Sequence, residues 1–449
     1  MPDLLTLMML AFPFFIAVLV PICASYLCWR CSHDPVMGVK LALWLFLVNS
    51  FFPLPVLPIG INIFAPDLLY LMFAMIGFFR VFQIKDYQIS HWLWLLLGSV
   101  LLGLFVAGTF KFKSTAGVEF RQFFAFWAGA MYLMTFQLNR KQVDDIFRAW
   151  VLIAAVMIPL VCFRWLAMGL GLSWVSEWNE GGTSLRVVSA SQTLFLAQSF
   201  IVAYYLWLKN SGSKWWAWML PIMFCCVLVL QHRSVWVVTL VSLALIYVLM
   251  PENRKKIKKQ FLVGAMVSTI LLGPLIATGK LDVISNSLEH SVEEAGSEKS
   301  TFMWRMQSAF ELLNGWAHDG PVVLLVGKPF GSGYERYVKA QNDAKVNVNP
   351  HNYYVLTILR GGSIGLLSIL LVYIIAIRKF MADKTFDGGV IETRLLAVLL
   401  IGQMLFYITY QAPEIQFVLI GLALTLGASI SSRKAEIVNY PLKSVRRSV

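Results

Sequence analysis

The chain has 449 residues, of which 58% are hydrophobic and only 14% are charged, whereas an ordinary soluble domain has roughly 45–50% and 25%. This composition excludes a soluble globular enzyme and predicts an integral membrane protein. The formal net charge of +13 does not indicate a nucleic-acid partner. The lysines and arginines cluster beside apolar runs, where positive charge is typical of cytoplasmic loops.

Apolar runs long enough to cross a bilayer, about 17 to 25 residues each, recur along nearly the whole chain. We expect spans at residues 4–28, 37–52, 66–82, 92–109, 119–137, 147–170, 190–208, 215–231, 233–249, 261–277, 352–377, 394–411 and 414–430. The fold class is therefore an all-α polytopic membrane protein with about 12–13 transmembrane helices. Segment 50–66 is too rich in proline for a clean span, and we expect a re-entrant or surface piece there.

Loop charges predict how the chain is threaded through the membrane. If the basic loop at 250–260 is cytoplasmic, every second connection should also be basic, and the sequence largely obeys this rule. The rule places the N-terminus and one long polar loop outside and the C-terminus inside. The predicted parts are an N-terminal bundle of about ten helices (1–277), a large periplasmic loop (278–350), C-terminal spans (351–430) and a basic cytoplasmic tail (431–449).

The long loop contains one stretch with helical periodicity, 300-STFMWRMQSAFELLNGW-316. Its apolar residues lie on one stripe and Ser300 is placed to cap its start, so we expect an amphipathic helix on the membrane. Arg305 lies on the flank of the stripe, where it either snorkels or turns toward a site beneath. The glycines at 327, 331 and 333 then predict a tight turn, with anion binding by its amides as the weaker reading.

Several polar residues have plain structural interpretations. His290, Glu293 and Glu294 have metal-ligand side chains, but an exposed acidic stretch is more often a solvated surface, so we expect no metal and no cofactor. Glu119 and Arg121 are expected to form a local ion pair at a helix end. Arg164 is ambiguous, since it could snorkel to the outer surface, and His232 is either a partner of Arg233 or, the interpretation we favour, an interfacial residue.

Three outward residues fit one kind of chemistry. Arg233 lies where two spans meet, Arg305 lies in the loop helix, and His351 heads the next span. Two guanidinium groups can neutralise a phosphate-rich group through charge-assisted hydrogen bonds. A histidine can accept a proton near neutrality. Together they match a transfer reaction from a pyrophosphate donor.

These residues resemble a family of membrane glycan transferases, the O-antigen ligases and the O-antigen or exopolysaccharide polymerases. The shared features are an arginine in the span before the long loop, an arginine and a tryptophan in a loop helix, a glycine-rich turn, and a His-Asn pair heading the next span. Here they are 231-QHRSVW-236, Arg305 with Trp316, 327-GKPFGSG-333 and 351-HN-352. Arg360 is a secondary candidate, because nine residues of helix, roughly 13 Å, separate it from His351.

The resemblance implies a glycosyltransferase in the bacterial inner membrane, with its active site facing the periplasm. It implies that Arg233 and Arg305 hold the pyrophosphate of an undecaprenyl-pyrophosphate-linked glycan, with Asn352 and Arg360 as further substrate-binding candidates. His351 would deprotonate the acceptor sugar hydroxyl, with inversion and without a metal. The acceptor is a carrier-linked glycan for a polymerase or the lipid A core for a ligase, and the sequence leaves both open. Proteins of polysaccharide assembly are candidate partners.

Two other classes of function compete with this interpretation. A transporter or flippase of the lipid-linked glycan would place polar residues along the depth of the bilayer, whereas here they gather at the outer end. A non-catalytic scaffold would account for the spans but not for the two arginines and the histidine.

Overall fold

The computed structural model describes residues 22–53, 55–59, 61–172, 186–209, 215–259, 301–338, 344–382 and 393–439. Within these ranges a helix occupies each position where a span is expected. The helices are α2 (Pro35–Phe51), α3 (Ala65–Val81), α4 (Ile89–Phe112), α5 (Ser114–Met134), α6 (Arg140–Gly169), α7 (Ala190–Leu208), α8 (Trp215–Val229), α9 (Arg233–Leu249), α14 (Tyr353–Ala382), α15 (Thr393–Phe406) and α16 (Phe417–Asn439). The expected spans at 4–28 and 261–277 fall largely or wholly outside the described residues.

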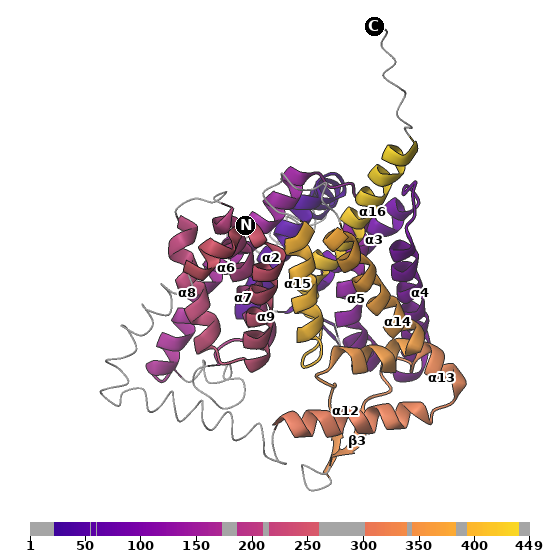
Figure 1. Cartoon of the computed structure of the whole chain (residues 1–449). Coiled ribbons are helices and arrows are strands. Elements are labelled where there is room, and N and C mark those ends of the chain that lie inside the picture. The colour runs from indigo at the N-terminus through magenta and orange to yellow at the C-terminus, as the bar shows by residue number, and fades with distance from the viewer. Residues whose placement is uncertain are drawn as a thin grey trace, which may run out of the picture.

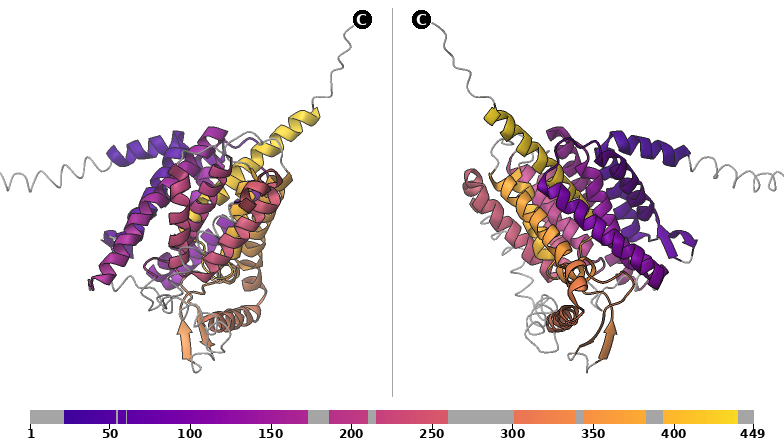
Figure 2. Two further views of the ribbon diagram at one scale, coloured as in Figure 1. Left: turned by 60° about the vertical axis from the view of Figure 1, so that its left-hand side comes forward. Right: turned by 90° about the vertical axis from the view of Figure 1, so that its right-hand side faces the viewer.

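These helices confirm an all-α membrane protein. Among the described residues, α4, α6 and α14 are long and apolar enough to cross a membrane, and five further apolar helices are shorter. The spanning helices run side by side with similar tilts (Figures 1 and 2). α16 continues to Asn439, so the first residues of the expected C-terminal tail are helical.

Close helix packing holds the bundle together next to the candidate site. α4 and α5 meet at Gly98, where an added Cβ would lie 2.1 Å from the Trp127 ring. The indole Nε1 of Trp94 donates to the Trp127 carbonyl and that of Trp127 donates to the Trp94 carbonyl, at 3.3 and 3.0 Å. A small residue lets two backbones approach, and the paired bonds leave neither indole N–H unsatisfied in an apolar surrounding.

The proline-rich segment 50–66 is a β-hairpin rather than a span. Strands β1 (Pro55–Ile59) and β2 (Ile61–Phe64) pair antiparallel, with Pro58 opposite Asn62. The prediction that no clean span forms here is confirmed, although the strands themselves were not expected. The hairpin leads directly into α3.

The long loop carries two helices and a second hairpin. α12 (Thr301–Ala317) lies across the lower end of the bundle in Figure 1, and the short α13 (Pro321–Val326) follows it. A glycine-rich turn then leads to β3 (Glu335–Val338), which pairs antiparallel with β4 (Ala344–Asn347). The amphipathic helix is confirmed, while its expected cap, Ser300, lies outside the described residues.

α14 contains a break that lets α13 pack against it. Gly362 has φ 62° and ψ −165°, which is not helical. A Cβ at this position would lie 2.1 Å from the Leu325 carbonyl oxygen of α13. Only glycine combines this left-handed φ with such a close approach, so Gly362 fixes α13 on α14.

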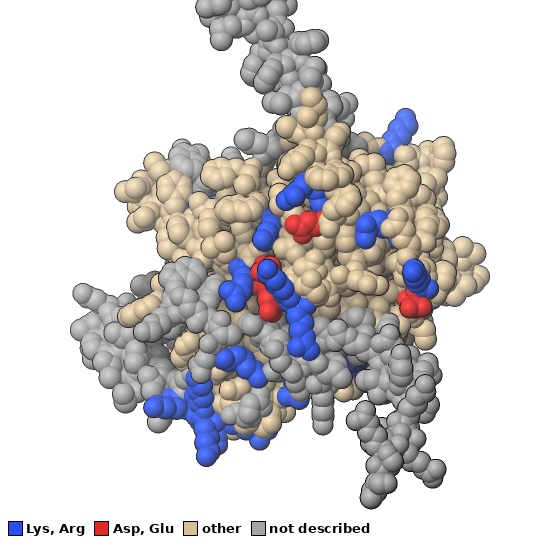
Figure 3. Space-filling model, turned by 90° about the horizontal axis from the view of Figure 1, so that it is seen from above, with Lys and Arg blue, Asp and Glu red and all other residues tan. Residues whose placement is uncertain are grey.

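The end of α14 lies at the opposite side of the bundle from α12. There Lys379 donates to Gln88 Oε1 at 2.9 Å and to the Gly427 carbonyl at 3.2 Å, joining α14 to the start of α4 and to α16. Figure 3 views this side of the molecule and shows lysines and arginines spread over it with few acidic residues between them. This pattern agrees with the predicted cytoplasmic side.

Arg164, which the sequence left ambiguous, does not snorkel to the surface. Its side chain is buried, and its two Nη atoms donate to the carbonyls of Val187, Ser50 and Phe51 at 2.9, 3.0 and 3.5 Å. The guanidinium also lies 4.3 Å from the Phe51 ring centre. It joins three segments of the bundle because backbone carbonyls that leave regular structure there need donors.

Candidate active site

The first turns of α12 direct Arg305 toward the bundle. Its Nη1 donates to the Thr409 carbonyl at 3.5 Å, and its guanidinium carbon lies 4.9 Å from the Tyr410 ring centre. Both partners lie between α15 and α16. The sequence left two orientations open for Arg305, and the structure favours the one toward a site over free snorkelling.

His351 lies directly before α14, where the chain enters the bundle. The segment around it is anchored on both sides, since Gln411 Nε2 donates to the Pro350 carbonyl and the Tyr353 amide donates to the Tyr407 carbonyl, each at 3.0 Å. The Asn352 side-chain oxygen accepts from the amides of Tyr354 and Val355 at 2.9 and 3.0 Å, and so caps α14.

Both Arg305 and His351 lie near the Tyr410 ring, which places them in one region. The His351 ring centre is 6.3 Å from that of Tyr410 and 6.1 Å from that of Trp304, the residue before Arg305. His351 itself remains exposed. A guanidinium and an imidazole are thus presented together at an accessible place.

The surroundings of His351 keep its imidazole neutral. Desolvation by neighbouring atoms, followed by repulsion from the positive charges of Arg305 and Arg336, lowers the pKa of His351 from 6.5 to about 4. A neutral imidazole has one nitrogen free to accept a proton. The site therefore holds His351 in the form that a general base requires.

The start of α9 holds the next candidate residue, Arg233. His232, the residue before Arg233, is buried, and its Nε2 lies 3.0 Å from the Val188 carbonyl oxygen. Burial, together with the charges of Arg186 and Arg305, lowers its pKa from 6.5 to about 4. The His232 side chain is therefore packed inside the protein. The Arg305 charge acts on both His232 and His351, and half-buried Arg233 begins α9 beside His232.

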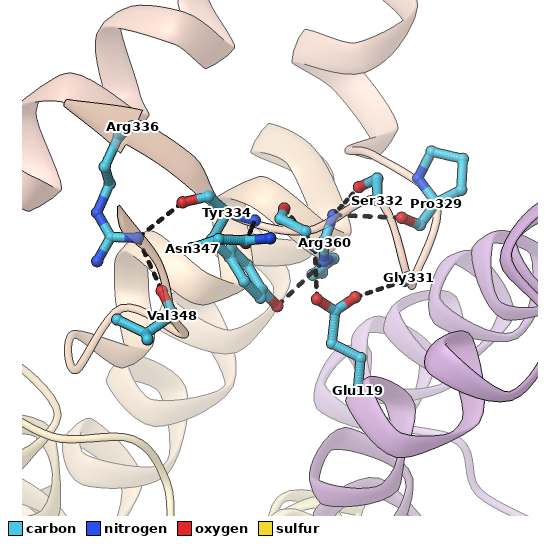
Figure 4. Close-up of polar contacts among 10 residues, drawn as sticks. Glu119, Pro329, Gly331, Ser332, Tyr334, Arg336, Asn347, Val348 and Arg360 are labelled. Carbon is cyan, nitrogen blue, oxygen red and sulfur yellow. Dashed lines mark hydrogen bonds and ion pairs between the residues drawn. The ribbon is translucent and has the colours of Figure 1, made fainter. Parts of the chain in front are cut away.

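Arg360 is fully buried and its donors are engaged within the protein. It donates to Glu119, Ser332, Gly333, Tyr334 and Pro329 over 2.6–3.2 Å (Figure 4). It lies 4.3 Å from the Tyr334 ring centre. The helix break at Gly362 comes after Arg360 in the chain and does not release the Arg360 side chain from these contacts. These contacts favour a role in holding the glycine-rich turn over direct substrate binding.

Glu119 and Arg121 do not pair with each other, contrary to the expectation. Glu119 accepts from Arg360 through Oε1 and from the Gly331 amide through Oε2, at 2.8 and 2.5 Å. Arg121 instead pairs with Asp67 at 3.3 Å. An amide of the glycine-rich turn does meet an anion, but this anion is the Glu119 carboxylate of the same chain.

Arg336 is a buried residue of the site region that sequence reasoning did not single out. It lies on the inward side of β3, and its guanidinium carbon is 5.9 Å from the Trp304 ring centre. Nε donates to Ser308 Oγ at 2.6 Å, and Nη1 donates to the carbonyls of Tyr334 and Val348 at 2.7 Å each. An arginine in a polar loop carries no signal by itself. Its burial shows only in the structure, where it alternates with exposed Glu335 and Tyr337 on β3.

Metal ligation finds no support in the described part of the chain, where no three His, Cys, Asp or Glu residues are grouped so that they could hold an ion. His290, Glu293 and Glu294 lie outside the described residues. The charges that converge near His351 are guanidinium groups, which bind anions.

Comparison with known proteins agrees with this arrangement. Residues 218–370 match the family model described as O-antigen ligase. The matched segment runs from α8 to α14 and includes Arg233, Arg305 and His351. No curated protein matches the chain. The part of the chain that carries Arg233, Arg305 and His351 is therefore similar to the O-antigen ligase family.

Proposed function

We propose that the protein transfers a glycan from a polyprenyl-pyrophosphate carrier, of the undecaprenyl type, to the hydroxyl of an acceptor sugar at the periplasmic face of the inner membrane. The observation that carries this proposal is that Arg305 and His351 both lie near the Tyr410 ring. The position of α12 across the bundle end opposite the basic side supports an outward-facing site (Figure 1).

In this proposal the arginines bind the diphosphate of the donor. Arg305, with Arg233 at the start of α9, offers forked donors that stay charged at any physiological pH. As the bond between the anomeric carbon and the diphosphate oxygen breaks, its electron pair remains on that oxygen. The guanidinium groups stabilise the added negative charge, which is the role that positioned donors have in other transfer reactions. The chemistry as proposed needs no metal.

His351 acts as the base for the acceptor. Its neutral imidazole accepts the hydroxyl proton while the acceptor oxygen bonds to the anomeric carbon on the side opposite the leaving diphosphate. The products are the new glycoside with inverted configuration, the polyprenyl diphosphate and a protonated His351. The acceptor is a second carrier-linked glycan in a polymerase or the lipid A core in a ligase, and both reactions require the same groups.

Reconstitution in lipid vesicles tests this function against transport. The purified protein is supplied with a radiolabelled lipid-linked glycan, and two quantities are measured: new glycosidic bonds and label moved across the bilayer. We expect new glycosidic bonds to form whether or not the label crosses the bilayer. Movement of the label without any new bond would support a flippase and would contradict the proposal.

A further inference from the structure

Arg336 joins three segments that meet at the candidate site. Its Nε donates to Ser308 of α12, while Nη1 donates to the carbonyl of Tyr334 at the end of the glycine-rich turn and to that of Val348 before His351. The side chain is 5% exposed. Figure 4 shows the bonds to Tyr334 and Val348 radiating from one guanidinium nitrogen.

We propose that Arg336 is a positioning residue, which fixes α12 and therefore Arg305 against the segment that leads into His351. This inference rests on the proposed function, because it assigns Arg336 to the same reaction. Ser308 lies three residues after Arg305 and thus about one turn away on α12. Val348 lies three residues before His351. The rigid guanidinium of Arg336 therefore sets the spacing between Arg305 on α12 and the segment that leads into His351.

The geometry of arginine is needed for this role. Its planar fork presents donors in fixed directions, so that Nε and Nη1 reach acceptors on different segments at once. A lysine at this position would keep the charge but not the fixed directions. Misplacement of a reacting group by about 1 Å can lower a rate 10²-fold, so a loosened α12 should impair turnover even in a folded protein.

The charge of Arg336 has a second, separable effect on the site. The groups that face His351 from the described elements are Arg305 on α12, Arg336 on β3 and Tyr410 after α15. The two arginines disfavour protonation of the imidazole. Loss of the Arg336 charge should therefore raise the pKa of His351, whereas loss of one neutral partner should not.

The matched variants separate geometry from charge. Arg336→Lys keeps the charge and loses the fork, Arg336→Gln loses both, and Ser308→Ala loses one acceptor and no charge. Glu335→Gln is the control, because Glu335 neighbours Arg336 on β3 but points outward to an exposed pair with Lys345. Ser308→Ala is also the milder variant if Arg336→Gln fails to fold.

The first measurement needs no substrate. The full-length protein in detergent is treated with diethyl pyrocarbonate, which modifies neutral imidazole, and modification of the His351 peptide is followed against pH. We expect the pH midpoint of His351 modification to move to higher pH in Arg336→Gln. We expect it to stay at the wild-type pH in Arg336→Lys and Ser308→Ala. His318, about 20 Å along α12 from Trp304, serves as the internal reference because charge effects between exposed groups fade beyond about 10 Å.

The second measurement is glycan transfer. We expect Arg336→Lys and Ser308→Ala to lower kcat by about 10- to 100-fold with little change in KM, while Glu335→Gln matches the wild type. Wild-type kcat in both Arg336→Lys and Ser308→Ala would overturn the positioning role. A His351 midpoint in Arg336→Gln that equals the one in Glu335→Gln would overturn the placement of Arg336 close to His351, on which the positioning role depends. If the wild-type protein transfers no glycan, the proposed function fails and the modification profile still tests the arrangement around His351.

Discussion

The Glu119 carboxylate in α5 accepts a hydrogen bond from Nη2 of Arg360 in α14 at 2.8 Å, and the two side chains are 9% and 0% exposed. The same carboxylate holds the Gly331 amide. Glu119 thus ties two helices to the glycine-rich turn that precedes β3. The position of Arg336, and through it that of α12, depends on this turn.

Glu119→Ala is expected to destabilise the protein by about 3–5 kcal/mol, because it leaves a buried guanidinium without its counter-charge. The double variant Glu119→Leu with Arg360→Met should recover part of this loss, since an apolar pair needs no counter-charge. Thermal unfolding in detergent measures both. Glu335→Gln, which alters only an exposed pair, is the control and should keep the wild-type midpoint. An unaltered midpoint for Glu119→Ala would show that the pair does not hold the turn.

Gly362→Ala should separate α13 from α14. The substitution forces a side chain into a left-handed φ, which costs about 1–2 kcal/mol, and it places Cβ 2.1 Å from the Leu325 carbonyl oxygen. Gly361→Ala is a matched control one residue away, where the nearest atom to an added Cβ is Leu101 Cδ2 at 4.0 Å. We expect a lower unfolding midpoint and lower transfer activity for the first variant only. Equal midpoints for the two variants would contradict the role assigned to the break.

Arg305→Ala should reduce transfer by about 10²- to 10³-fold, the typical effect of removing one donor that stabilises developing negative charge. Arg305→Lys should recover only part of the activity, because lysine retains the charge without the forked donors. Initial rates with purified protein and a lipid-linked donor measure both effects. Lys328→Ala provides a control in the same loop, since Lys328 pairs with Asp319 away from His351. Full activity of Arg305→Ala would remove this arginine from the site.

The pH dependence follows from the lowered pKa of His351. The shift is downward from 6.5 to about 4, so the neutral base persists as pH falls and is lost only as pH approaches about 4. The acid limb of kcat/KM, which reports the free enzyme, should therefore lie near pH 4. A bound diphosphate offsets the guanidinium charges and should raise the pKa, so the acid limb of kcat should lie at higher pH. The measurement is a pH–rate profile of both constants. Acid limbs of kcat/KM and kcat at the same pH would contradict the predicted effect of the bound diphosphate on the pKa of His351.

The sequence predicted the helices well because apolar length is a strong local signal. Every expected span within the described residues is helical, and α12 and the glycine-rich turn also formed where expected. The prolines of segment 50–66 correctly excluded a span, but two short strands with many apolar residues gave no clear alternation to reveal the β1–β2 hairpin.

The side-chain partners were harder to predict because they are far apart in the sequence. Glu119 pairs with Arg360 rather than with nearby Arg121, and Arg164 and His232 are buried by segments that periodicity cannot place beside them. Of the three residues Arg305, His351 and Tyr410, the sequence singled out Arg305 and His351 by their residue types. Tyr410 and Arg336 carried no such signal, since a tyrosine at a helix end and an arginine in a polar loop are both common.

The most direct test of the account uses His351→Gln, which removes the base and keeps a polar side chain of similar size. The purified variant is given a lipid-linked donor and an acceptor, with donor binding and glycosidic product measured in the same sample. We expect donor binding close to that of the wild type, because the arginines remain, and a loss of product of about 10²- to 10⁴-fold. Product formation at the wild-type rate would contradict it.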